Sequence, residues 1–210
     1  MVCIYIYIYL CRGLRDIHSS GKAVKTVKEG MDSEYVAVEF HSNNEGIIHR
    51  DIKLGNLVIA QDTDGYRVKY IDFGIAILTI EANNTLAGRW GYCGTDGFIP
   101  PEMMRGSDHF LSQSENNHKK AWDIWSLGRV IYALITGFPP LYKYGMDKDD
   151  MITLQYYTRN VPNRLCEMLE YMMHPNPARR PTAEDMLEKL GENHTPLTGE
   201  EVDRLLGEEY

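Results

Sequence analysis

A short stretch of mixed charge constrains this chain more than any other part of the sequence. The stretch GIIHRDIKLGNLVIA, residues 46–60, packs His, Arg, Asp, Lys and Asn into eight positions between two apolar runs. Charged groups are costly to bury without partners, so the pattern predicts a polar loop that is held on a buried scaffold. A charged surface turn, of the kind that many proteins carry, is the plainer alternative.

Four further stretches follow it along the chain. They are VKYIDFGIAIL (residues 68–78), CGTDGFIPPE (93–102), AWDIWSLGRVIYALITGFPP (121–140) and NPARRPTAEDML (176–187). The order and spacing of the five stretches resemble the eukaryotic protein kinase family, and five motifs in family order are far more specific than one. The resemblance covers about residues 7–190. It implies a kinase-like α+β fold, made mainly of the α-helical C-terminal lobe with one remnant strand of the N-terminal lobe.

The resemblance implies a site that transfers phosphate from ATP. Such transfer needs alignment, metal ions on the phosphates and a proton acceptor, with little covalent help from the protein. Asp51 is similar to the family's catalytic base, and Lys53 would contact the transferred phosphate. Asn56 and Asp72 would hold Mg²⁺, a hard cation that prefers oxygen ligands. Taken singly, each of the four residues is equally well explained as a hydrogen-bonding group of a loop.

Two further matches concern the ligands. Val58 resembles the family's residue beneath the adenine ring of ATP, although a strand valine is more often plain core. Lys53 and Thr95 together resemble the serine/threonine branch of the family, with Thr95 as a member of the catalytic set. The resemblance therefore implies ATP and Mg²⁺ as cofactors, and a protein substrate whose serine or threonine hydroxyl accepts the phosphate.

Supporting roles are implied for seven other residues, which are His49, Arg50, Phe73, Gly74, Glu102, Asp123 and Arg180. His49 and Phe73 resemble members of a hydrophobic spine on which the catalytic loop and Asp72 rest. Glu102 and Arg180 resemble a buried ion pair of the lower lobe.

Two of these supporting residues carry more specific expectations. Asp123 resembles a buried helix carboxylate that accepts hydrogen bonds from the catalytic loop, which would satisfy a group that is costly to bury. Arg50 resembles the arginine that binds a phosphate on the activation segment. Gly91 stands where many relatives carry the phosphorylated threonine, so Thr79 and Thr85 remain as acceptors.

The apolar spacing predicts secondary structure around the motifs. Helices are predicted over residues 22–41, 121–136, 162–173 and 182–190, with a polar loop over 105–120 and a short helix in the tail, residues 191–210. The helix over 121–136 is apolar on most sides, which is typical of the middle of a domain. Thr182 and Asp185 have the spacing of a helix cap.

The chain opens with MVCIYIYIYLCRG, in which Ile and Tyr alternate from Ile4 to Tyr9. Strict alternation predicts a β-strand, and here both of its faces are apolar. With the resemblance, residues 1–12 are interpreted as the last strand of the N-terminal lobe and the hinge, where adenine would meet backbone groups. Residues 13–190 then form the C-terminal lobe, and residues 1–190 a kinase domain that is truncated at its N-terminus.

Two functions stay open at this point, because no G-x-G-x-x-G loop precedes HRD in this sequence. The first is an ATP-dependent serine/threonine protein kinase. The second is a truncated pseudokinase that acts as a binding module or scaffold, for which an uncovered opening strand would recruit a partner strand. The complete set of catalytic residue types favours the first. A related non-kinase phosphotransferase fits PPE and DIWSLG less well.

Composition excludes some classes of partner. The formal net charge of −8 argues against a general nucleic-acid binder. The opening apolar run ends at Arg12, short of the about 20 residues that a membrane helix needs, so no membrane partner is expected. The four cysteines show no paired spacing, which favours a reducing, intracellular and cytoplasmic setting.

Overall fold

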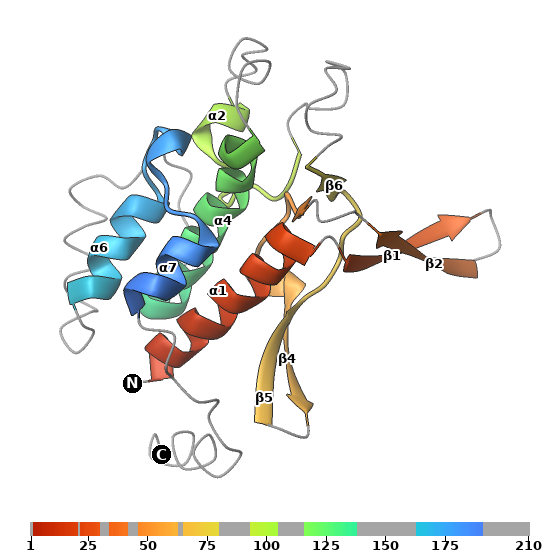
Figure 1. The fold of residues 1–210 in the computed structure, drawn as a ribbon, viewed down its shortest axis with the longest axis horizontal. Coiled ribbons are helices and arrows are strands. Elements are labelled where there is room, and N and C mark those ends of the chain that lie inside the picture. The colour runs from red at the N-terminus through yellow and green to blue at the C-terminus, as the bar shows by residue number, and fades with distance from the viewer. Residues whose placement is uncertain are drawn as a thin grey trace.

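The computed structural model describes residues 2–20, 22–29, 34–41, 46–62, 65–79, 93–104, 116–137 and 163–190 of the chain. In chain order they form α1 (Val2–Ser20), β1 (Lys22–Glu29), β2 (Glu34–His41), β3 (Ile47–Ile48), η1 (Leu54–Asn56), β4 (Leu57–Asp62), β5 (Gly65–Tyr70), β6 (Ile77–Leu78), α2 (Pro101–Met104), α4 (Asn116–Thr136), α6 (Asn163–Met172), η3 (Pro177–Arg179) and α7 (Ala183–Leu190). The helices lie together, and the hairpins β1–β2 and β4–β5 extend from them (Figure 1). This mixture of helices with few strands is consistent with a kinase-like α+β fold.

Helix α4 forms the centre of the helical group. Every residue from 121 to 133 is buried, as expected for a helix that is apolar on most sides. The helix predicted over residues 121–136 is therefore confirmed, although α4 already begins at Asn116. Residues 116–120 thus belong to the helix rather than to the loop predicted over 105–120, and the rest of that stretch lies outside the described residues.

The predicted opening strand is wrong, because residues 2–20 form helix α1. The buried positions of α1 are Tyr7, Ile8, Leu10, Cys11, Leu14, Ile17 and His18. Most of these positions recur at intervals of three and four, which places them along one stripe of a helix. The alternation of Ile and Tyr covers too few residues to outweigh this longer pattern.

The hinge predicted near residues 9–12 is wrong as well, because it depends on the predicted strand. Backbone N–H and C=O groups inside a helix bond to each other four residues apart, so those of residues 9–12 are not available to an adenine ring. Helix α1 also has no open strand edge, and the expectation that a partner strand pairs with this segment is wrong for the same reason.

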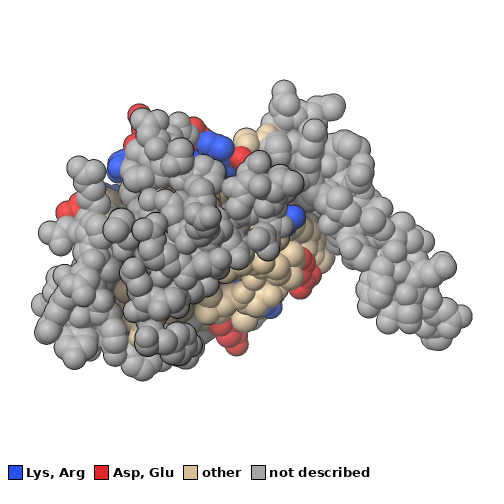
Figure 2. Space-filling view, turned by 90° about the horizontal axis from the view of Figure 1, so that it is seen from below, with Lys and Arg blue, Asp and Glu red and all other residues tan. Residues whose placement is uncertain are grey.

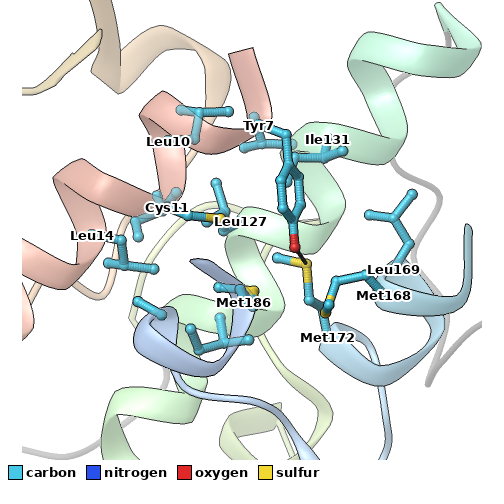
Figure 3. Close-up of a cluster of buried hydrophobic side chains, with 14 of the residues drawn as sticks. Tyr7, Leu10, Cys11, Leu14, Leu127, Ile131, Met168, Leu169, Met172 and Met186 are labelled. Atoms are coloured by element: carbon cyan, nitrogen blue, oxygen red, sulfur yellow. Dashed lines mark hydrogen bonds between the residues drawn. The ribbon is translucent and has the colours of Figure 1, made fainter. Parts of the chain in front are cut away.

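Helix α1 packs into an apolar cluster with α4, α6 and α7. Figure 3 shows Leu10 and Leu14 from α1 in this cluster, together with Leu127 from α4 and Met172 from α6. The Tyr7 hydroxyl donates to the sulfur of Met172 across 3.5 Å. Burying one side chain of this size stabilises a fold by about 1.5–3 kcal/mol. Apolar packing between four helices is therefore the main source of stability in this part of the chain.

Residues 22–41 contain a β-hairpin, and the helix predicted there is wrong. Strand β1 pairs with β2 in antiparallel register, with Lys22 opposite His41 and Glu29 opposite Glu34. The stretch is rich in Val, Thr, Tyr and Phe, which favour strands over helices. Its apolar residues fit a helical stripe by spacing alone, but the residue types decide for the strands.

Gly46 brings the chain back to α1 after this hairpin. A Cβ atom on residue 46 would clash with the backbone of His18, in the last turn of α1. The Gly46 carbonyl also accepts a hydrogen bond of 2.9 Å from the Thr79 backbone N–H, just after β6. The start of β3 can therefore lie directly against the last turn of α1 only because residue 46 has no side chain.

The remaining strands form two separate pairs. Strands β3 and β6 form one antiparallel pair, and β4 and β5 form another.

The helices predicted over residues 162–173 and 182–190 are confirmed as α6 and α7. The tail, residues 191–210, lies outside the described residues.

The cap predicted at the start of α7 is confirmed. The Thr182 backbone N–H and hydroxyl donate to the Asp185 carboxylate at 2.8 and 2.7 Å, and the Asp185 N–H donates back to the Thr182 hydroxyl at 3.1 Å. This reciprocal arrangement satisfies backbone groups that the first turn of a helix leaves without partners.

Two features of the structure concern the membrane and nucleic-acid partners that the composition argues against. Among the described residues, no helix combines the length and the apolar character that a membrane span requires. On the face shown in Figure 2, the charged side chains of the described residues form small separate patches around uncharged surface.

Gly46 provides a test of this packing. We expect Gly46→Ala to lower the free energy of unfolding by about 1–3 kcal/mol, because the new methyl group forces β3 away from α1. Gly55→Ala is a matched control, since its Cβ would meet only the Lys53 side chain at 4.0 Å. Urea unfolding of both variants measures the difference, and equal stability of the two would contradict the close approach at Gly46.

Candidate functional site

The polar loop after β3 is anchored by one buried carboxylate. Asp123 of α4 is fully buried, and its Oδ2 and Oδ1 atoms accept hydrogen bonds from the backbone N–H groups of His49 and Arg50, at 2.8 and 2.9 Å. A buried carboxylate is destabilising unless its oxygens are satisfied, and here both are. The structure thus places Asp123 where the sequence analysis expects it, against the loop backbone.

His18 of α1 is a third partner of this carboxylate and was missed from the sequence. Its Nε2 atom lies 2.9 Å from Asp123 Oδ2, and the ring is buried. Since a carboxylate only accepts hydrogen bonds, the Nε2–H group donates. The helical stripe of α1 was the signal that could have found it, because His18 is the last buried position of that stripe. The assignment of a strand to the opening residues concealed the stripe.

The loop itself contains an uncommon backbone conformation. Arg50 has a φ of 67°, in the left-handed region that non-glycine residues rarely adopt. Its N–H is held by Asp123, and its Nε donates to the Ile75 carbonyl at 2.6 Å. Strain of this kind persists where surrounding contacts fix the backbone, and it is often found at functional sites.

Arg50 is expected to bind a phosphate on the activation segment, and the structure describes only part of that segment. Its guanidinium group donates a hydrogen bond to the carbonyl of Ile75, two residues after Phe73. Thr79 is buried, with 5% of its surface exposed. Thr85 and Gly91 lie outside the described residues.

Four predicted site residues meet in one hydrogen-bonded cluster, which we call the Asp51 cluster: Asp51, Lys53, Asn56 and Thr95. Asp51 Oδ1 accepts from the Thr95 hydroxyl at 2.7 Å. Asp51 Oδ2 accepts from Lys53 Nζ at 2.9 Å and from Asn56 Nδ2 at 3.1 Å. Lys53 Nζ also donates to the Thr95 hydroxyl at 2.9 Å, and Asn56 Nδ2 to the Asp51 carbonyl at 2.9 Å. The structure therefore brings together residues from two separate motifs.

The environment of Asp51 keeps its carboxylate ionised. Partial burial by itself would raise the pKa of Asp51. Hydrogen bonds from Thr95 and Lys53, the positive charge of Lys53 and the hydrogen bond from Asn56 outweigh burial and lower that pKa below its usual value. The carboxylate is therefore negatively charged at neutral pH.

Thr95 reaches Asp51 because the CGT segment lies directly against the loop. Gly94 has a φ of 106°, and a Cβ atom there would lie 2.7 Å from the Arg50 carbonyl oxygen. Only glycine permits both the positive φ and this close approach. The glycine of the motif thus positions the threonine that follows it.

Asp72 and Phe73 are joined to the same loop from the other side. The Ile71 N–H donates to the Asn56 carbonyl at 3.0 Å, which places Asp72 one residue from this contact. Asp72 has a φ of 62° and is exposed, and its Oδ1 accepts from the Gly74 N–H at 3.3 Å. Exposed carboxylate oxygens at this position are accessible to a cation.

The expected contact between His49 and Phe73 is present. Their ring centroids lie 4.7 Å apart, and the His49 side chain is fully buried. His49 Nε2 lies 3.0 Å from the Ile71 carbonyl oxygen, so that nitrogen donates. His49 thus connects the loop to the segment that carries Asp72.

The residues of this site fit a magnesium ion that is shared with a nucleotide. Among the described residues, no group of three or more His, Cys, Asp or Glu side chains could hold a metal by themselves. Mg²⁺ is commonly held by one or two protein oxygens together with substrate phosphates. Asn56 and Asp72 supply such oxygens, because Asn56 uses its Nδ2 for Asp51 and keeps its Oδ1 as an acceptor.

Val58, expected beneath the adenine ring, lies on β4 and is 41% exposed. The preceding residue, Leu57, packs against the core. Side chains alternate along a strand, so Val58 faces away from that core. The Val58 side chain therefore offers exposed apolar surface on β4.

Glu102 and Arg180 form the ion pair expected for them. Arg180 Nη1 and Nη2 donate to the two Glu102 carboxylate oxygens at 2.6 and 2.8 Å. Arg180 also donates to the Ala121 and His174 carbonyls at 3.0 and 2.8 Å, and its guanidinium carbon lies 4.9 Å from the Trp125 ring centroid. A buried ion pair is stable when its remaining donors are satisfied, as they are here.

Comparison with known proteins identifies the family to which the sequence is similar. Residues 10–190 match the family described as the protein kinase domain. The chain is 30% identical over 196 residues to serine/threonine-protein kinase PLK1 of Xenopus tropicalis, an alignment that covers 88% of this chain and 29% of that protein. It is 31% identical over 150 residues to the probable cell cycle serine/threonine-protein kinase CDC5 homolog of Encephalitozoon cuniculi, covering 69% of this chain and 29% of the relative.

A relative with a different name shows the same similarity. The chain is 28% identical over 184 residues to the delta subunit of calcium/calmodulin-dependent protein kinase type II of Oryctolagus cuniculus, covering 82% of this chain and 31% of the relative. The chain thus spans less than a third of the length of these curated relatives.

Asp123 can be tested by a substitution that keeps its shape. Asp123→Asn replaces one acceptor oxygen with an NH₂ group that must face an N–H donor of His18, His49 or Arg50. We expect the free energy of unfolding to fall by about 1–3 kcal/mol for each buried donor that loses its partner. Asp16→Asn, at a carboxylate that is 65% exposed, is the control. If urea unfolding finds both variants as stable as the wild type, Asp123 does not anchor the loop.

The lowered pKa of Asp51 predicts how stability depends on pH. A carboxyl group with a lowered pKa in the folded state stabilises the fold above its unfolded-state pKa, and this contribution is lost as the pH falls through the folded value. We expect the wild type to lose more stability than Asp51→Asn between about pH 6 and pH 3, which spans the ordinary aspartate pKa. Unfolding curves at both pH values test this, and parallel losses in the two proteins would refute it.

Proposed function

The chain belongs to the eukaryotic protein kinase family, in its serine/threonine branch, and on this premise we propose that the Asp51 cluster transfers the γ-phosphate of ATP to serine or threonine hydroxyls of a protein substrate. The observation that carries the proposal is the convergence of Asp51, Lys53, Asn56 and Thr95 in one hydrogen-bonded cluster. Asp72 lies beside them through the contact of Ile71 with Asn56.

Asp51 is proposed to orient the attacking hydroxyl and to accept its proton. A carboxylate with a lowered pKa is a weak base, so it removes a proton efficiently only when the hydroxyl has become acidic late in the reaction. Holding the hydroxyl in line with the phosphate is then its larger contribution, since alignment accounts for much of the rate of phosphoryl transfer.

Lys53 is proposed to neutralise charge on the transferred phosphate. An ammonium group has three N–H donors, of which two are directed to Asp51 and Thr95. The third is available to a phosphate oxygen. With its side chain 29% exposed, Lys53 can reach a nucleotide from the position where it already stabilises the ionised form of Asp51.

Asn56 and Asp72 are proposed to hold Mg²⁺, with the remaining ligands coming from the phosphates. When bound, the ion offsets negative charge on the phosphate oxygens. The Nδ2 group of Asn56 is fixed by two hydrogen bonds to Asp51, which directs its Oδ1 away from the carboxylate. Val58 is proposed to lie against the adenine ring.

Thr95 supports serine or threonine as the acceptor. Its hydroxyl donates to Asp51 and accepts from Lys53, and so connects both side chains. The relatives are serine/threonine kinases by name. We therefore propose a protein substrate, with the hydroxyl of a serine or threonine entering beside Thr95.

The proposal is tested by transfer of labelled phosphate from Mg·ATP to three peptides that differ only in carrying Ser, Thr or Tyr. We expect transfer to Ser and Thr, and a loss of about 10²–10⁴-fold in rate for Asp51→Asn, the usual contribution of a positioned base. Asp16→Asn, at an exposed carboxylate on α1, controls for the change of charge.

The possible results separate the candidate functions. A rate unchanged in Asp51→Asn, or a preference for Tyr, contradicts the proposed role of the Asp51 cluster. Absence of any transfer by the wild type, with the fold intact, supports the alternative of a pseudokinase that acts as a binding module or scaffold.

A further inference from the structure

A cavity of about 440 Å³ lies apart from the Asp51 cluster. It is lined by residues from the C-terminal part of α1, the N-terminal half of α4, and the segment from η3 to the first turn of α7. None of Asp51, Lys53, Asn56 or Thr95 lines it. Its volume falls within the roughly 300–1,000 Å³ of small-molecule sites.

One wall of the cavity is apolar. Ile124 of α4 forms part of it, together with Pro177, Ala178 and Pro181 from the segment before α7. These side chains have no hydrogen-bonding groups, so this wall suits the hydrocarbon or aromatic body of a ligand.

The lining also includes two basic residues, Arg15 of α1 and Lys120 of α4. Lys120 is half-buried, and burial lowers the pKa of its ammonium group. No acidic partner of Lys120 is found among the described residues. A partly desolvated cation without an ion-pair partner is costly, and an anion from solution would offset that cost.

The acidic residues at the cavity are already engaged. Glu184 Oε2 lies 3.9 Å from Arg15 Nε, and Arg15 Nε also lies 3.3 Å from Asp16 Oδ1. The Asp185 carboxylate accepts two hydrogen bonds from Thr182 in the cap of α7. Arg15 is thus shared between two carboxylates, and Lys120 is the lining cation without an acidic partner among the described residues. One such cation favours a ligand with a single negative charge over a phosphate, whose charge is about −1.5 to −2.

We propose that this cavity binds a small organic monocarboxylate, with its apolar body against Ile124, Pro177 and Pro181 and its carboxylate on Lys120 beside Arg15. The site is independent of ATP and of the proposed transfer reaction. It lies directly behind the loop anchor, because His18 and Arg180 line the cavity and also hold Asp123 and Glu102.

The probe for this site is 4-phenylbutyrate, which joins an aromatic body to one carboxylate. Binding to the full chain is measured by titration with ligand-observed NMR, alongside the neutral 4-phenylbutanamide and inorganic phosphate. We expect saturable binding of 4-phenylbutyrate, and binding of the amide and of phosphate weaker by about tenfold or more, as for loss of one charge-assisted contact.

Three variants locate the binding. Lys120→Gln removes the charge, and Ala178→Phe fills the cavity from an exposed position without changing any charge. Both are expected to weaken 4-phenylbutyrate by about tenfold or more. Lys189→Gln, on α7 above Tyr171 and outside the cavity, is the control and should bind like the wild type. Thermal unfolding of each variant verifies the fold, and Ala178→Phe keeps the test valid if Lys120→Gln is unstable.

Three results would overturn the proposal. The first is no saturable binding of 4-phenylbutyrate up to about 10 mM, where even fragment-sized ligands of real sites bind. The second is equal affinity in the wild type and in the folded variants Lys120→Gln or Ala178→Phe. The third is tighter binding of inorganic phosphate than of the carboxylate, which would assign the cavity to a different anion.

Discussion

The structure depends on one fully buried carboxylate, that of Asp123. Its two oxygens accept from His49 and Arg50, which lie 74 and 73 residues earlier in the chain, and from His18, which lies 105 residues earlier. Burying a carboxylate in an apolar helix is destabilising by several kcal/mol unless donors surround it. The donors come from α1 and from the loop after β3. The buried carboxylate of α4 is therefore satisfied only when α1, this loop and α4 pack together. The core and the site are therefore not separate features of this fold.

The Asp51 cluster is built on this anchor. Asp51 follows two residues whose backbone N–H groups are fixed by Asp123, and one of them, Arg50, is held at a positive φ. The same strained conformation occurs at Asp72, on the segment that His49 connects to the loop. One unfavourable backbone conformation thus precedes Asp51 and the other lies at Asp72 itself, and hydrogen bonds of the surrounding segments offset their cost. A site held in this way keeps its geometry without a ligand, which is what alignment-dependent phosphoryl transfer requires.

A second ionic contact fixes the other side of the helical group. Arg180, which follows η3, pairs with Glu102 of α2 and also donates to the backbone of α4 at Ala121. Together with Asp123, it surrounds the N-terminal half of α4 with satisfied charges. Lys120 stands between them without an acidic partner among the described residues, at the edge of the cavity for which we propose a carboxylate ligand.

The amino-acid sequence by itself determined the family, the kinase-like class and most of the candidate site. The HRD, DFG, CGT and DIWSLG motifs carry their residues in a fixed order, and the structure brings Asp51, Lys53, Asn56 and Thr95 into contact. The sequence also predicted α4, which is apolar on most sides, and α6 and α7, because there, unlike in residues 22–41, the apolar spacing coincides with residue types that favour helices.

Only the tertiary structure decided the first twenty residues and the groups that depend on them. A short apolar run with alternating residues fits a strand and a helix equally well, so its state is set by the surface against which it packs. For α1 that surface is α4 and α7, more than a hundred residues later in the chain, and it selects the helix that presents Tyr7, Leu14 and His18. The contact of His18 with Asp123 and the cavity beside Lys120 arise from the same packing. Neither has a local signal, because each is formed by residues that only folding brings together.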